Sequence, residues 1–168
     1  MNIDVPSKIK LIYNQIISCL DFCNILLLGA SDKDIRPLKL MLNRAIRFVF
    51  SLGIRDHITP HYRSLGLLPI RERIIFKACI MAHKIFYNSA PIYLCEKFDK
   101  FKKTTNIKLR ETSGRDAFMF HADLNTHKAN NLMAKITITW NTLPYDLRKL
   151  ESVSLFKSKL KTKLLSEI

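Results

Sequence analysis

The residues best placed to do chemistry are cations on one face of a helix predicted over residues 32–52. At about 100° per residue, Arg36, Lys39 and Arg47 fall within about 80° of one another, and Arg44 lies beside them. Cations that are one helical turn apart can follow a phosphate backbone. A basic face that is merely solvated has the same pattern. The spacing therefore predicts a face for a polyanion and leaves the solvated alternative open.

Two further cations, Arg71 and Arg73, stand near the start of a second, more apolar helix. The chain carries 28 Lys and Arg against 14 Asp and Glu, a formal net charge of +14. Such an excess favours nucleic acid or an anionic membrane as a partner, although charge that only serves solubility would give the same total. The predicted contacts to the backbone of RNA or DNA are Arg36, Lys39, Arg44, Arg47, Arg71 and Arg73.

Residues for phosphoryl transfer or hydrolysis are missing from the sequence. Two-metal phosphoryl transfer needs paired carboxylates, and no two acidic residues are adjacent in this chain. The sequence has no Gly-rich phosphate loop and no Gly-x-Ser-x-Gly nucleophile elbow. We therefore expect no catalytic residue, no bound metal and no cofactor in this chain.

Cysteine and histidine pairs offer two other chemistries. Cys79 and His83 are four residues apart and could pair as nucleophile and base, but a small cysteine on an apolar helix is more typical of a core. A zinc site would use residues that are also spaced by four, which are Cys19, Cys23, His57 and His61. Structural zinc sites usually take tight pairs in one compact unit, so we regard both chemistries as minor alternatives.

The cysteine pattern and the hydropathy indicate the cellular compartment of the chain. The four cysteines lack the spacing of a small secreted domain, which indicates reduced thiols in the nucleus or cytoplasm. The most apolar run, residues 16–30, is shorter than the roughly 20 residues that cross a bilayer, and it contains Asp21 and Asn24. We therefore predict no membrane partner.

Helical periodicity dominates the rest of the chain. Pro69 is predicted to open a central helix, and Pro6, Ser31 and Ser152 are expected to begin three others. The apolar face of the central helix repeats at spacings of three and four, through Ile70, Ile74, Ala78, Met81 and Ile85. Its cations are expected to face solvent, and they are Arg71, Arg73, Lys77 and Lys84.

The predicted fold class is mainly α, a single-core helical domain of five or six helices with at most a short β-hairpin. Weak alternation over residues 107–120 predicts that hairpin. A lysine-rich run near residue 103 divides a helical region, 1–103, from a C-terminal extension, 104–168, expected to pack on the same core. Trp140 is expected to anchor that core.

Short motifs occur in one consistent order along the chain. They are Asp21-Phe22-Cys23-Asn24, His57-Ile58-Thr59-Pro60, Leu67-Leu68-Pro69-Ile70, Ala90-Pro91-Ile92-Tyr93-Leu94 and Trp140-Asn141-Thr142-Leu143-Pro144. This order resembles the thumb and post-polymerase C-terminal region of non-LTR (LINE-type, jockey-like) retrotransposon reverse transcriptase polyproteins. The sequence departs from that pattern between residues 123 and 139.

The resemblance implies a part of an RNA-directed DNA polymerase that helps to hold the RNA template and its DNA product. The family's Tyr/Phe-x-Asp-Asp motif is not present, so the chain is expected to be a non-catalytic fragment that binds nucleic acid without sequence preference. Other regions of the polyprotein would be further partners. A host-retained nucleic-acid-binding module, or a structural or protein-interaction domain, remains the alternative.

Overall fold

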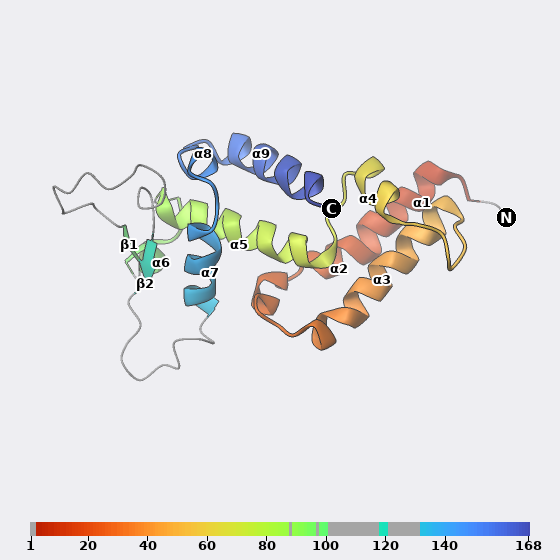
Figure 1. The fold of residues 1–168 in the computed structure, drawn as a ribbon, viewed down its shortest axis with the longest axis horizontal. Coiled ribbons are helices and arrows are strands. Elements are labelled where there is room, and N and C mark those ends of the chain that lie inside the picture. Colours follow the sequence, from red (N-terminus) through yellow and green to blue (C-terminus); the bar gives the residue numbers. More distant parts are fainter. Residues whose placement is uncertain (1–2, 88, 97, 101–117, 121–131) are drawn as a thin grey trace. The chain divides into compact units, whose positions relative to one another are not determined.

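The fold is mainly helical, which confirms the predicted fold class (Figure 1). A computed structural model describes residues 3–87, 89–96, 98–100, 118–120 and 132–168. The described residues contain more helices than the five or six expected, because several are single turns. The chain forms two compact units, Met1–Ile74 with Leu164–Ile168, and Ile75–Lys163. The boundary expected near residue 103 lies outside the described residues.

The first unit begins with a helical segment of three consecutive parts. These are α1 (Val5–Ile12), a π-helical turn (Tyr13–Ile17) and α2 (Ser18–Asp21). Asp4 caps α1, because its carboxylate accepts a hydrogen bond from the Ser7 amide at 3.4 Å. Pro6 lies in the first turn, as predicted. A 3₁₀ turn, Asn24–Leu27, then leads toward the next helix.

The longest helix of the first unit, α3 (Asp32–Phe50), begins where the sequence predicts. Ser31 caps it, because its hydroxyl accepts a hydrogen bond from the Asp34 amide at 3.3 Å. Ser51 ends the helix with a φ of 53°, in the left-handed region. One face of α3 is fully buried, through Ile35, Leu42, Ala45, Ile46 and Val49. This face packs beside α1, which explains why the apolar periodicity is so regular.

A short helix and a glycine turn connect α3 to the central helix. The short helix, α4, spans Thr59–Ser64, and the turn after it uses Gly66 at a φ of 58°. The central helix, α5 (Ile70–Phe86), begins directly after Pro69, whose carbonyl accepts from the Arg73 amide at 2.9 Å. Ile58 occupies the cap position of α4 and no side chain caps this helix, although Thr59 is a residue type that favours caps.

The second unit contains most of α5 and the C-terminal helices. The remaining elements are α6 (Ile92–Cys95), β1 (Phe98–Lys100), β2 (Phe118–Phe120), α7 (Leu132–Asn141), α8 (Tyr145–Arg148) and α9 (Val153–Ser166). Ser152 precedes α9 and accepts from the Leu155 amide at 3.5 Å, as its predicted capping role requires. Phe156, Leu160 and Leu164 are buried, which confirms the predicted inward face of this helix.

Aromatic side chains form the core of the second unit. Trp140 is fully buried, so the prediction of a core anchor is confirmed. Its ring stacks on Phe86 with centroids 5.4 Å apart and lies 5.8 Å from Phe156. Met81, by contrast, is only half-buried, although Ile74, Ala78 and Ile85 on the same predicted face are buried. The apolar face of α5 therefore turns away from Met81.

The short hairpin differs from the prediction. β2 pairs antiparallel with β1, with Phe98 opposite Phe120, so its partner strand lies within the lysine-rich run and not at residues 107–110. Phe98 belongs to β1 and not to the preceding helix, because α6 stops at Cys95. The predicted first strand, residues 107–110, lies outside the described residues. Helix α7, in the segment where the family pattern was lost, was not predicted because its β-branched residues weaken the helical signal.

Two apolar residues near the start of the chain are exposed against expectation. One interpretation of the Asp21-Phe22-Cys23-Asn24 motif is a helix kink with a buried aromatic, but Phe22 is 81% exposed. Leu26 was expected to be buried and is 67% exposed. The left-handed backbone of Cys23, with a φ of 50°, turns the chain at this point. As a result the side chain of Asn24, and not the ring of Phe22, lies in the interior.

Candidate nucleic-acid interface

The structure separates the six predicted cations into different environments. Three of them, Arg36, Lys39 and Arg71, line one groove on the first unit, with a volume of about 790 Å³. We call this the polar groove, and its polar lining residues are Asp32, Arg36, Lys39, Asn43, Thr59, Tyr62, Arg71 and Glu72. Arg44, Arg47 and Arg73 do not line it.

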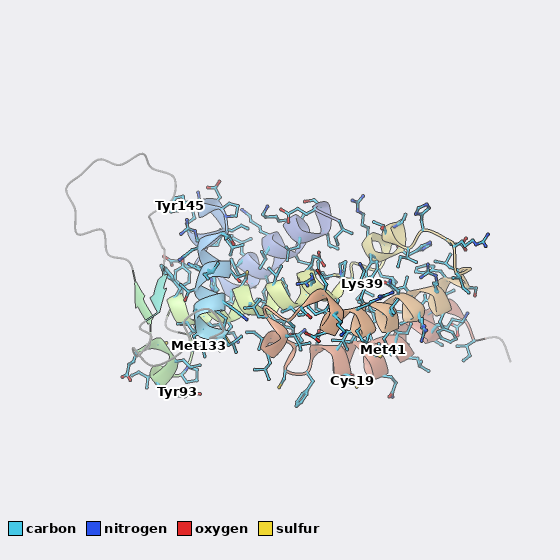
Figure 2. The ribbon with its side chains drawn as sticks, turned by 60° about the horizontal axis from the view of Figure 1, so that its bottom comes forward. Cys19, Lys39, Met41, Tyr93, Met133 and Tyr145 are labelled. Atoms are coloured by element: carbon cyan, nitrogen blue, oxygen red, sulfur yellow. The ribbon has the colours of Figure 1, made fainter. Side chains whose placement is uncertain are left out.

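Arg36 and Lys39 are the accessible cations of the polar groove. Both side chains are exposed, and within the described part of the chain neither has an ion-pair or hydrogen-bond partner. They lie three residues apart on α3, which corresponds to a rise of about 4.5 Å. This separation is comparable to the 3.4 Å rise between phosphates of one DNA strand, so both cations can contact one backbone. Figure 2 labels Lys39 on α3.

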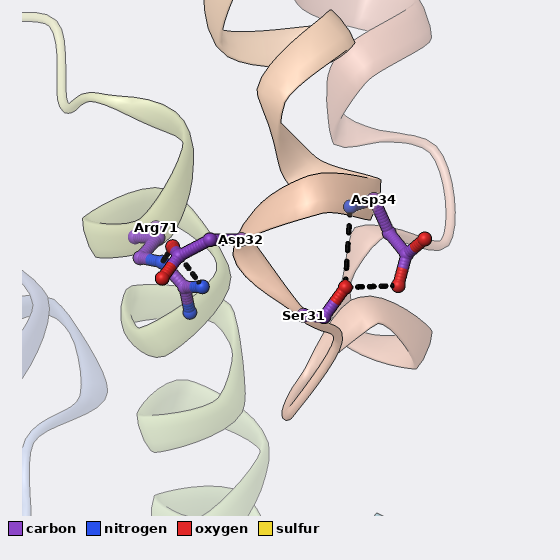
Figure 3. A network of polar contacts seen from close by, with 4 residues as sticks. All are labelled: Ser31, Asp32, Asp34 and Arg71. Atoms are coloured by element: carbon purple, nitrogen blue, oxygen red, sulfur yellow. Dashed lines mark hydrogen bonds and ion pairs between the residues drawn. The ribbon is translucent and has the colours of Figure 1, made fainter.

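Arg71, the third cation of the polar groove, is held by Asp32 (Figure 3). Its Nε donates a hydrogen bond to Oδ1 of Asp32 at 3.0 Å, and Nη2 donates to the same oxygen. Asp32 is 93% exposed, so water competes for this pair and its net energy is small. Ser31 and Asp34 beside it form the α3 cap and make no contact with Arg71 (Figure 3). An incoming phosphate could therefore compete with Asp32 for Arg71.

A partly buried hydrogen bond joins two lining residues of the polar groove. The Tyr62 hydroxyl donates to Oδ1 of Asn43 at 2.7 Å, which joins α4 to α3. Burial, with a smaller contribution from the Glu72 carboxylate, raises the pKa of Tyr62 well above its ordinary value. The hydroxyl therefore stays protonated and remains a donor. Asn43 was noted beside the cations in the sequence, but no local pattern pointed to Tyr62.

Arg47 has a structural role that the sequence did not reveal. Its guanidinium donates to the carbonyls of Gly53, Ile54 and Asp56 at 3.0, 2.9 and 3.1 Å. These three acceptors belong to the loop between α3 and α4, and the side chain is half-buried. A guanidinium with its donors used in this way is not available to a phosphate. The prediction that Arg47 contacts nucleic acid is therefore not supported by its geometry.

Arg73 was predicted to face solvent, and this is wrong. Its residue is 9% exposed, and Nε lies 2.6 Å from Oδ1 of Asp21. Desolvating a guanidinium is unfavourable unless a carboxylate compensates, and the end of α2 supplies Asp21. Arg71 and Arg73 were grouped as one cluster, yet only Arg71 reaches the polar groove. Two residues along a helix differ by about 200°, which puts these side chains on opposite faces.

Arg44 is exposed but lines a second groove, between α1 and α3. We call this the apolar groove, and it is lined by Leu11, Ile12, Ile16, Pro37, Leu40, Met41, Arg44, Ala45 and Phe48. Arg44 was predicted to act beside Arg36 and Lys39, but the structure does not place it with them. A phosphate in the polar groove would not lie against Arg44.

Cys79 and His83, the pair considered above as a minor catalytic alternative, are both buried. Burial raises the pKa of the Cys79 thiol to about 12 and lowers that of His83. His83 Nε2 lies 2.6 Å from the Leu150 carbonyl, so this nitrogen donates to a backbone acceptor. A protonated, fully buried thiol is a poor nucleophile. No cluster of three or more potential metal ligands occurs among the residues that the structure describes.

Comparisons with known proteins identify no relative. No family model, curated protein or solved structure matches the chain. Among the described residues, no helix combines the length and apolar character that a membrane crossing requires. The functional interpretation consequently depends on the residues themselves and on the sequence resemblance.

Proposed function

We propose that this chain is a non-catalytic part of a non-LTR retrotransposon reverse transcriptase, C-terminal to the palm, that binds the backbone of RNA or DNA without sequence preference. The contacts are made by Arg36, Lys39 and Arg71. The ordered motifs between Asp21 and Pro144 support the family assignment, and the polar groove supports the binding role. Other regions of the polyprotein are expected partners.

The observation that carries the binding role is the pair of exposed cations in the polar groove that have no partner among the described residues. Many surface cations of a basic protein are solvated at random, but Arg36 and Lys39 share one concave surface with a third cation. Backbone contacts position nucleic acid and carry no sequence information, so binding through these cations would show no sequence preference. The two carboxylates in the groove, Asp32 and Glu72, limit its affinity.

Salt-dependent binding tests this role. Replacing Arg36 and Lys39 together by Gln should weaken binding to single-stranded RNA and to duplex DNA. On duplex DNA the log–log salt slope should become shallower by about two units, since each phosphate neutralised contributes about 0.9. The matched control replaces Lys157 and Lys159, two exposed cations of α9, by Gln. Equal loss in the control would show that only total charge matters.

The family assignment has its own test. A transcript that continues upstream into coding sequence for a Tyr/Phe-x-Asp-Asp palm motif would support it, whereas an upstream stop or unrelated domain would favour a host-retained module. The purified chain should not extend a primer on an RNA template with Mg²⁺ or Mn²⁺, because it has no paired carboxylates. Primer extension above background would contradict the proposal.

A further inference from the structure

The apolar groove exposes hydrocarbon to solvent. It runs between α1 with its π turn and α3, has a volume of about 570 Å³, and contains no carboxylate among its lining residues. Four of its large apolar side chains are between 39% and 47% exposed, and they are Leu11, Leu40, Met41 and Phe48. Isolated exposed apolar residues are normal on a protein surface, but a contiguous apolar groove marks an interaction site.

Helix α3 is apolar on two sides. Its buried face forms the core of the first unit, as described above. A second stripe of residues at spacings of four, three and four faces the groove, through Pro37, Met41, Arg44 and Phe48. Lys39 and Met41 project from different sides of α3 (Figure 2), and Leu40 between them lines both the polar groove and the apolar groove. One helix therefore supports two adjoining surfaces that differ in polarity.

Cations surround this hydrocarbon. Arg44 lies in the stripe itself, and Nζ of Lys8 lies 5.1 Å from the centre of the Phe48 ring. Lys33, which is exposed, is one turn before Pro37 on the same side of α3. Asp34 also lies on this side of α3, but its carboxylate accepts a hydrogen bond from the Ser31 hydroxyl. The excess of positive charge favours an occupant whose apolar side chains are flanked by negative charge. A second copy of this chain would bring like charges together at Arg44, which disfavours self-association.

We propose that the apolar groove binds an amphipathic helix of a partner protein whose apolar stripe is flanked by Asp or Glu. A helix is favoured because the groove lies between two helices and is concave, so a third helix can insert a ridge of side chains. A flat bilayer surface would not fill such a concavity, and a nucleic-acid backbone would leave the hydrocarbon exposed. The two grooves share only Leu40 among their lining residues, and the interaction does not rest on the nucleic-acid proposal.

A pair of synthetic helical peptides tests the partner's chemistry. Each has about 16 residues with Leu at every third or fourth position, and the flanking positions are Glu in one peptide and Lys in the other. The Glu peptide should bind the intact chain at least about tenfold more tightly than the Lys peptide in a fluorescence anisotropy titration. Equal affinity of the two peptides, or no binding of the Glu peptide, would overturn the proposal.

Variants then locate the binding surface. Met41→Ser should weaken binding of the Glu peptide by about tenfold, because Met41 contributes apolar contact area. Leu155→Ser is the control, since Leu155 is similarly exposed at 46% but lies on α9. Both positions are on the surface, so circular dichroism and thermal melting should show that both variants remain folded. Equal effects of the two changes would place the binding elsewhere.

A charge exchange separates specific docking from apolar adhesion. Arg44→Glu should weaken binding of the Glu peptide and strengthen that of the Lys peptide. An unchanged preference would overturn the role of Arg44. Two further measurements address other occupants: flotation with phosphatidylserine vesicles, and sedimentation as a function of protein concentration. Vesicle binding or dimerisation that is lost in Met41→Ser, without binding of the Glu peptide, would assign the groove to a membrane or to a second copy instead.

Discussion

The Arg73 guanidinium lies 2.6 Å from the Asp21 carboxylate, so an ion pair joins the start of α5 to the end of α2. Arg73 is almost buried in this pair and Asp21 is partly covered. The contact places a charge in the interior of the first unit, next to a core that is otherwise apolar. It also explains why a residue that the sequence assigned to solvent does not reach the polar groove.

Removal of Asp21 should therefore destabilise the first unit. In Asp21→Ala the guanidinium of Arg73 would stay desolvated without its carboxylate, and we expect a loss of about 2–4 kcal/mol in the free energy of unfolding. Urea denaturation followed by circular dichroism measures this. The control is Glu151→Ala, which removes an exposed carboxylate and should change stability by no more than about 0.5 kcal/mol. Similar losses in both variants would mean that the ion pair contributes nothing specific.

Asp32 should limit the affinity of the polar groove for nucleic acid. Asp32→Asn removes a negative charge and releases Arg71, so binding to RNA should become about two- to fivefold tighter at low salt. Asp34→Asn is the matched control, because Asp34 is also in the first turn of α3 but contacts Ser31 instead of Arg71 (Figure 3). A gain of the same size in Asp34→Asn would show that the released cation is unimportant.

Arg47 should stabilise its loop without contributing to binding. Arg47→Gln removes hydrogen bonds to three carbonyls, and we expect a loss of about 1–3 kcal/mol in stability with faster amide exchange over residues 51–57. The affinity of the folded variant for RNA should stay within about twofold of the parent, since the guanidinium is already occupied. A selective loss of RNA binding in Arg47→Gln would show that Arg47 does contact nucleic acid.

His83 should make the stability of the second unit depend on pH. Burial lowers its folded-state pKa below the ordinary value of 6.5, so the unfolded chain takes up this proton more readily than the folded chain. The contribution of a neutral His83 is present above about pH 6.5 and is lost as the pH falls below it. His83 contacts Tyr87, Trp140 and Phe156, and its Nδ1 has no partner among the described residues.

The measurement compares urea unfolding at pH 7.5 and pH 5.5. His83→Phe keeps an aromatic ring but cannot titrate, so its stability should fall less over this interval than that of the parent. Loss of the hydrogen bond to Leu150 should lower its stability at pH 7.5. The control is His57→Gln, because His57 is exposed and its replacement should leave the pH dependence unchanged. The same slope in parent and His83→Phe would exclude the buried imidazole as the cause.

The helices and several of their ends were predictable from the sequence. The hydroxyls of Ser31 and Ser152 cap helices, and Gly66 adopts a left-handed turn, because these effects depend on neighbours within a few residues. Apolar spacing likewise identified most of the inward face of α5, through Ile74, Ala78 and Ile85. The same local reasoning failed for α7, where β-branched residues mask a helix stabilised by the burial of Ile136 and Trp140.

Only the tertiary structure decided which cations are available to contact nucleic acid. Arg36, Lys39, Arg44, Arg47 and Arg73 look alike in the sequence, since periodicity gives the side of a helix but does not show what lies beside it. A carboxylate at the end of α2 takes Arg73, loop carbonyls take Arg47, and the neighbouring α1 surrounds Arg44 with hydrocarbon. Arg36 and Lys39 remain exposed because no described element supplies them with a partner. The energy of a charged group depends on its desolvation and its partner, and both are set by segments that are distant along the chain.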